Sequence, residues 1–207
     1  MILKAKHSFF LYPFFRWYTR FRMKRNFHQV YINGKFEDRN LPVMLLSNHV
    51  SWWDGFWLEY FNLKLLHRKL HFMMLEDQLQ KHWFFNYSGG FSVRKSSKSI
   101  IESLKYTAEI MQDPENMVFM FPQGRIRSML SKELKFENGI EKILTYSKND
   151  IHVLFVANFL EYLSQPKPSL YIHFSEYEGI SKNTADLENA YNTFYGNALR
   201  YHYNLAE

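Results

Sequence analysis

Short apolar runs alternate with amphipathic stretches along most of the chain. The apolar runs predict strands at residues 28–33, 43–46, 71–75, 89–93, 117–121, 152–157 and 169–174. Most of them show little polar alternation, which is typical of strands covered on both faces. The run at 169–174 alternates more, and we expect it at an edge of the sheet. The first run leads into Asn33 and Gly34, which predict a turn.

Amphipathic segments between these runs predict helices. They lie at residues 52–61, 76–85, 96–112 and 138–147, and a tyrosine-rich segment from Thr184 onward is expected to close the fold as a helix. Strands and helices that take turns in this way predict an α/β class, with a mainly parallel central sheet flanked by helices. No internal repeat or linker interrupts the pattern, so residues 26–207 are expected to form one domain.

Residues 1–25 carry a different pattern, in which aromatic side chains recur at helical intervals. The aromatic positions are Phe10, Phe14, Trp17, Tyr18 and Phe21. The basic residues on a different face are Arg16, Arg20 and Lys24. Pro13 is expected to start or kink this helix, since proline is tolerated in a first turn. The longest apolar run here, residues 9–15, is far shorter than the ~20 residues that span a bilayer.

The distribution of charge supports a surface role for the same segment. The chain has 26 Lys and Arg against 20 Asp and Glu, and seven of the basic residues but no acidic residue fall within residues 1–25. A basic helix with an aromatic face is typical of helices that lie in a membrane interface, which is the interpretation we prefer. The alternatives are a helix packed on its own domain and, third, a nucleic-acid contact, for which no recognisable motif is present.

Two titratable residues stand five places apart in the stretch SNHVSWWD, residues 47–54. His49 and Asp54 follow the strand at 43–46, where the chain turns toward a helix. A neutral imidazole accepts a proton from a hydroxyl when a carboxylate on its other ring nitrogen fixes its tautomer. This pair is a weak signal by itself, because a single histidine is more often part of the core. Trp52 and Trp53 fit a wall of such a site and a core position equally well.

Arginines follow two other predicted strands. Arg94 comes directly after GGFSV, and Arg125 and Arg127 come after MVFMF in the stretch FPQGRIRS. Guanidinium groups bind phosphate in a bidentate way, and Gly124 lets the backbone come close to a ligand. Since sites in α/β sheets gather where strands end, three arginines in these positions favour an anion site over solvated surface charges.

Together the three segments resemble the glycerolipid acyltransferase family, the lysophosphatidate acyltransferase-like enzymes. NHVSWWD is similar to the NHxxxxD block of that family, GGFSVR to its second block and FPQGRIRS to its third block, FPEGTRS. KFENG, residues 135–139, stands where a Phe-x-x-Gly element normally follows. The blocks keep the order and spacing of the family over residues 43–157, which favours the catalytic interpretation of His49.

The resemblance implies an O-acyltransferase. His49 would be the general base that deprotonates an acceptor hydroxyl, and Asp54 would be its orienting partner. The acyl donor would be a thioester, either acyl-CoA or acyl-carrier protein, and no cofactor is expected. Direct transfer agrees with the absence of cysteine from the chain. The residues expected to bind a lysophosphatidate-like acceptor are Arg94, Gln123, Gly124, Arg125 and Arg127.

Departures from the family pattern concern the acceptor. Gln123 stands where the family has glutamate, Arg125 stands where it has threonine, and the strand at 152–157 lacks the proline of the fourth block. One alternative is therefore the same chemistry on a non-phosphate acceptor, such as a glycolipid or a carotenoid glycoside. Another is a catalytically silent membrane-binding module, whereas a serine hydrolase would need a G-x-S-x-G elbow that is missing. We expect peripheral attachment to the cytoplasmic face of the cell membrane through residues 1–25.

Overall fold

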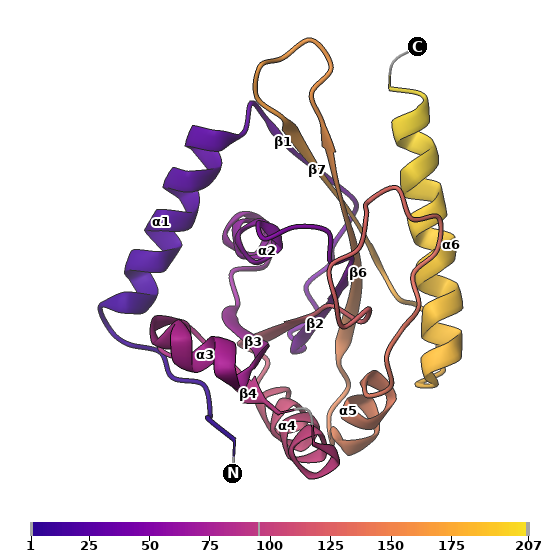
Figure 1. Cartoon of the computed structure of the whole chain (residues 1–207). Coiled ribbons are helices and arrows are strands. Elements are labelled where there is room, and N and C mark those ends of the chain that lie inside the picture. Colours follow the sequence, from indigo (N-terminus) through magenta and orange to yellow (C-terminus); the bar gives the residue numbers. More distant parts are fainter. Residues whose placement is uncertain (1, 95, 206–207) are drawn as a thin grey trace.

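A central β-sheet lies between two layers of helices. The structure is a computed structural model and describes residues 2–94 and 96–205. Within these residues the sheet has seven strands in the order β1-β7-β6-β2-β5-β3-β4 (Figure 1). The strands are β1 (Val30–Asn33), β2 (Val43–Ser47), β3 (Lys69–Leu75), β4 (Gly90–Val93), β5 (Asn116–Met120), β6 (His152–Glu161) and β7 (Ser169–Glu176). All neighbours pair in parallel except β6 and β7, so the predicted mainly parallel sheet is confirmed.

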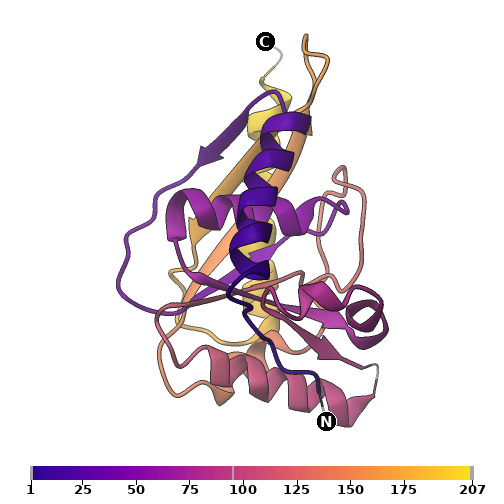
Figure 2. The ribbon, with the colours of Figure 1, turned by 90° about the vertical axis from the view of Figure 1, so that its left-hand side faces the viewer.

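Helices cover both faces of this sheet (Figures 1 and 2). Six α-helices occur in the described part of the chain: α1 (Leu11–Asn26), α2 (Asp54–Phe61), α3 (Glu76–Lys81), α4 (Ser97–Ile110), α5 (Ile140–Tyr146) and α6 (Thr184–Tyr203). A π-helical turn, Asn62–Leu66, extends α2, and a 3-10 turn, Trp83–Phe85, follows α3. One core cluster joins the sheet to α1 and α2, and a second joins it to α4, α5 and α6. The α/β class predicted from the sequence is therefore confirmed.

Strand β2 illustrates why the central strands appear in the sequence as continuous apolar runs. All five of its residues are buried. Because neighbouring side chains of a strand point to opposite faces, Val43 and Leu45 pack in the cluster with α1 and α2, while Met44 and Leu46 pack in the cluster with α4, α5 and α6. A strand that is covered on both faces needs apolar residues at every position.

The expected edge position of the run at 169–174 is wrong. This run forms β7, which lies between β1 and β6, and the two edges of the sheet are β1 and β4. The more polar positions of β7 face α6 rather than water. His173 lies with its Nε2 atom 3.0 Å from Nε2 of His202, the last-turn histidine of α6. Burial lowers the pKa of both imidazoles to about 4, so both are neutral near pH 7 and one can donate to the other.

The N-terminal segment begins as an extended strap along the edge strand β4. Within residues 2–8, the N–H group of Lys6 donates to the carbonyl of Asn86 at 2.8 Å, and the carbonyl of Leu3 accepts from the N–H group of Ser92 at 2.9 Å. Figure 2 shows this strap running from α1 toward α4. Backbone pairing of this kind satisfies part of an exposed sheet edge.

Helix α1 starts at Leu11 and carries Pro13 in its first turn, where the missing N–H group costs no helical hydrogen bond. Its buried side chains, Thr19 and Met23, lie on the side that packs on α2, while Phe14, Trp17 and Phe21 are exposed. No helix among the described residues combines the length and the apolar character needed to cross a membrane.

Candidate active site

His49 and Asp54 meet where β2 gives way to α2. His49 follows Ser47, the last residue of β2, by two positions, and Asp54 is the first residue of α2. The Nδ1 atom of His49 lies 2.6 Å from Oδ2 of Asp54. The convergence expected from their spacing is therefore present. Because a carboxylate can only accept, Nδ1 carries the proton in the neutral imidazole and Nε2 keeps a free lone pair.

Contacts other than the one with the imidazole also hold the carboxylate of Asp54 in place. Its side chain is buried, and Oδ2 also accepts from the backbone N–H groups of Val50 at 2.8 Å and of Ser51 at 3.0 Å. Asp54 opens α2, where the free N–H groups of a helix favour negative charge. These contacts leave the carboxylate little freedom to rotate, so the imidazole it orients has one defined position.

The backbone of His49 is held by the loop that follows β5. Oε1 of Gln123 accepts from the N–H group of His49 at 2.6 Å, and the N–H group of Arg127 donates to the carbonyl of His49 at 2.8 Å. The ring of Phe121 stacks on the imidazole with a centroid distance of 4.1 Å. The third motif, FPQGRIRS, therefore cradles the histidine of the first motif.

Buried hydrogen bonds of two asparagine side chains connect the end of β2 to β6. The side-chain amide of Asn48 donates to the carbonyl of Asn158 at 3.0 Å, and its oxygen accepts from the N–H group of Asn158 at 2.8 Å. The side chain of Asn158 in turn donates to Oγ of Ser47 at 3.0 Å. This reciprocal pairing fixes the backbone directly before His49. No local sequence pattern indicates it, because the partners are 110 residues apart.

The tight turn after β5 requires a glycine. Gly124 has φ +64°, in the left-handed region, and a Cβ atom added there would lie 3.1 Å from Cγ of Glu137. The N–H group of Glu137 donates to the carbonyl of Pro122 at 2.7 Å, so KFENG packs directly on this turn. The side chains of Arg125 and Arg127 are exposed, and within the described residues no carboxylate forms an ion pair with them.

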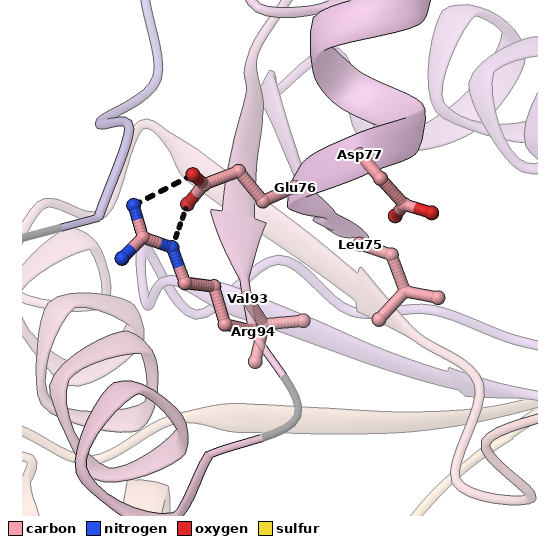
Figure 3. A pocket seen from close by; sticks show the side chains of 5 residues that line it. All are labelled: Leu75, Glu76, Asp77, Val93 and Arg94. Carbon is pink, nitrogen blue, oxygen red and sulfur yellow. Dashed lines mark hydrogen bonds and ion pairs between the residues drawn. The ribbon is translucent and has the colours of Figure 1, made fainter.

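Arg94 lies apart from these groups and is engaged by an acid that the sequence analysis missed. Its Nε and Nη2 atoms donate to the two carboxylate oxygens of Glu76, each at 2.7 Å (Figure 3). The pair borders a pocket of about 330 Å³ that is also lined by Leu75, Asp77 and Val93. Strand neighbours lie about 4.8 Å apart, so the end of β4 is roughly 14 Å across the sheet from the end of β2. The three arginines therefore all follow the carboxyl ends of strands, but they do not meet at one point.

Trp52 and Trp53 occupy different environments. Trp52 is 65% exposed and packs against Phe56 with a centroid distance of 5.3 Å, so it is not a core residue. Trp53 is half-buried, and the guanidinium of Arg22 from α1 lies 4.7 Å from its ring centroid. The two tryptophans thus link the turn that carries His49 to α1. In the described residues no group of three His, Asp or Glu side chains is arranged to hold a metal ion.

Comparison with known proteins places these motifs in a family. No curated protein matches the chain closely enough to count as a relative. A family model described as Acyltransferase matches residues 19–157, which is more than half of the chain. The matched span runs from α1 into β6 and contains His49, Asp54, Arg94 and the whole FPQGRIRS loop. The chain belongs to the glycerolipid acyltransferase family.

Proposed function

We propose that this acyltransferase moves a fatty acyl group from a thioester to a hydroxyl of a lipid acceptor, with His49 as the general base. The observation that carries the proposal is the 2.6 Å contact between Nδ1 of His49 and the buried carboxylate of Asp54. It leaves Nε2 free to take a proton, and the carboxylate stabilises the imidazolium that forms.

The reaction needs no covalent enzyme intermediate. Nε2 of His49 removes the proton of the acceptor hydroxyl as its oxygen attacks the carbonyl carbon of the thioester. The tetrahedral intermediate collapses, the carbon–sulfur bond breaks, and the imidazolium returns the proton to the leaving thiolate. The absence of cysteine from the chain fits this direct transfer. Acyl-CoA and acyl-carrier protein present the same thioester and are both proposed as donors.

The first candidate acceptor is a lysophosphatidate-like lipid. Arg125 and Arg127 lie on the loop that cradles His49, and their exposed guanidinium groups suit a phosphate close to the reacting hydroxyl. The second candidate is an uncharged acceptor such as a glycolipid. It is favoured by Arg94, whose guanidinium is already engaged by Glu76.

We further propose that the protein works as a peripheral enzyme at the cytoplasmic face of the cell membrane. Support comes from α1, whose exposed Phe14, Trp17 and Phe21 stand beside the basic residues Arg20 and Lys24. A catalytically silent module that only binds membranes would use the same surface. Catalysis must therefore be tested separately from binding.

The test of the proposed function is acyl transfer from labelled palmitoyl thioesters to a panel of hydroxylated lipids. We expect His49→Ala to lower the rate at least about a hundredfold, because a general base contributes that much or more. His28→Ala, which removes an exposed histidine, is the matched control and should keep the rate. Liposome binding should be equal in all three proteins. Equal rates for wild type and His49→Ala would reject His49 as the base, and hydrolysis without transfer would indicate a thioesterase.

A further inference from the structure

The pairing of Arg94 with Glu76 occupies one of the two edges with which a guanidinium binds phosphate, and it offsets the charge of Arg94. Figure 3 shows the edge formed by Nε and Nη2 turned toward the carboxylate of Glu76. Bidentate recognition of phosphate uses the same kind of parallel pair of N–H donors. An acidic head group could use this edge only by displacing Glu76.

Glu76 is anchored more firmly than Arg94. It is the first residue of α3, directly after β3, and its side chain is 11% exposed against 55% for Arg94. Oγ of Ser92 donates to Oε2 of Glu76 at 3.2 Å, and the N–H group of Leu3 donates to the same hydroxyl at 2.8 Å. The hydrogen bonds from Arg94 lower the pKa of Glu76, so its carboxyl group stays ionised near pH 7.

Displacement of Glu76 would be unfavourable for two reasons. Among the described residues, the carboxylate would keep Ser92 as its one side-chain donor after losing both bonds to Arg94. A phosphate at Arg94 would also lie beside the negative charge of Glu76, which repels it. Hydroxyl groups meet no such barrier, because they donate to carboxylates and accept from guanidinium groups.

We propose that Glu76 determines the acceptor specificity of this enzyme: by pairing with Arg94 it makes the pocket at the end of β4 select an uncharged, hydroxylated head group over a phosphate. This inference rests on the proposed function and selects the second of its two candidate acceptors, the uncharged one. Glu76 acts through Arg94 and is a specificity residue rather than a catalytic one.

The test compares two acceptors that differ only in a phosphate, 1-oleoylglycerol and 1-oleoylglycerol 3-phosphate, presented in uncharged micelles with one thioester donor. Wild type should favour 1-oleoylglycerol. Glu76→Gln should shift the ratio of kcat/KM toward the phosphorylated acceptor by at least about tenfold, because Arg94 becomes free to make charge-assisted hydrogen bonds. The change should appear in the KM of the phosphorylated acceptor and not in the KM of the donor.

Two further variants separate the ion pair from general charge. Arg94→Gln should change the ratio less than about twofold in wild type but should remove the gain in the Glu76→Gln background. Asp77→Asn removes a carboxylate from the same pocket without touching the pair, and it should leave the ratio within about twofold. An equal shift in Asp77→Asn would reject the specific role of Glu76. A preference of wild type for the phosphorylated acceptor would also reject this role, whether or not Arg94→Gln abolishes that preference.

Calorimetric titration with glycerol 3-phosphate gives a readout that does not depend on activity. We expect binding by Glu76→Gln that is at least about tenfold tighter than by wild type, and a loss of that gain when Arg94→Gln is added. Equal affinity in wild type and Glu76→Gln overturns the inference. Transfer that fails with every acceptor, in wild type as in His49→Ala, rejects the proposed function, and the titration still decides whether Glu76 withholds Arg94 from phosphate.

Discussion

Gln123 shows how a departure from a family motif can leave the geometry of the site unchanged. It stands where related sequences are expected to carry glutamate, and its Oε1 atom accepts from the backbone N–H group of His49 at 2.6 Å. An amide oxygen accepts this bond as a carboxylate oxygen does. The side chain is buried, so it supports the histidine from within the loop instead of reaching for the acceptor.

This position gives a prediction about catalysis. Gln123→Ala leaves the N–H group of His49 without its acceptor and loosens the imidazole, so we expect kcat to fall about tenfold to a hundredfold with little change in the KM of either substrate. Gln123→Glu keeps an acceptor oxygen and should restore most of the rate. Steady-state kinetics of the two variants check this, and an equal loss in both would show that the amide has another role.

For single residues, the sequence predicts contacts within one motif better than contacts between motifs. Five residues separate His49 from Asp54, so a single turn sets their contact. Arg94 and Glu76 are 18 residues apart and meet only because β3 and β4 pair in parallel, with Leu75 opposite Val93. No local sequence pattern predicts this contact. The sequence therefore indicated that Arg94 is free to bind an anion.

Among the elements, the contact between α1 and α2 contains a buried acid. Glu59 of α2 is nearly fully buried, its Oε1 atom lies 3.6 Å from Nε of Arg16 on α1, and Asn62 donates to its Oε2 atom at 3.1 Å. Burial raises the pKa of Glu59 to about 7, despite the opposing effects of Asn62, Arg16 and Arg20. The folded protein therefore holds this proton more tightly than the unfolded chain does.

The consequence for stability has a definite sign. The contribution of the protonated Glu59 is fully present below pH ~4.5 and is lost as the pH rises through about 7. Glu59→Gln removes this loss, so its free energy of unfolding relative to wild type should improve by about 3 kcal/mol between pH 4 and pH 8. Urea denaturation at both pH values measures the difference. Glu37→Gln, at an exposed carboxyl, is the control and should follow wild type, and a parallel profile for Glu59→Gln would contradict the prediction.

Strand β7 shows why its position in the sheet was predicted wrongly from the sequence. Its alternation of Leu170, Ile172 and Phe174 with Tyr171 and His173 has the period of a strand with one wet face. In the fold the second set packs against Tyr201 and His202 of α6, so Tyr171, His173 and His202 are buried although they carry polar groups. Hydropathy alone does not distinguish a polar face that contacts a helix from one that contacts water.

Across the whole molecule, exposed and half-buried aromatic side chains form a series of ring contacts from α1 to Trp52, close to the candidate active site. Phe14 stacks near Tyr18, Tyr18 contacts Phe56, and Phe56 contacts the exposed Trp52 at centroid distances of 6.0, 6.1 and 5.3 Å. Trp52 is three residues from His49. In the proposed peripheral enzyme, this aromatic surface would connect the exposed side of α1 to the turn that carries His49.

This surface gives a prediction for membrane binding. Replacing Phe14 and Trp17 by alanine should weaken the association with anionic liposomes at least about tenfold, since aromatic side chains bury large areas in an interface. Folding should not suffer, because both side chains are exposed. The control variant carries Ile180→Ala and Tyr203→Ala, which are both exposed. Tyr203 is the last residue of α6, and this helix lies on the other side of the sheet from α1 (Figure 1). Co-sedimentation that is equal in both variants would reject the surface formed by α1.

The pairing of β1 with β7 has a consequence for how the chain is made. Val30 lies opposite Leu170, so the partner of this early strand is synthesised 140 residues later. At a typical translation rate of about 5–20 residues per second, β1 waits roughly 7–28 s before its neighbour exists. During that interval β2, β3, β4, β5 and β6 can already pair with one another, whereas β1 has no strand to pair with. The edge of the sheet that holds β1 must therefore close last, and its contacts are among the most distant in sequence that the fold contains.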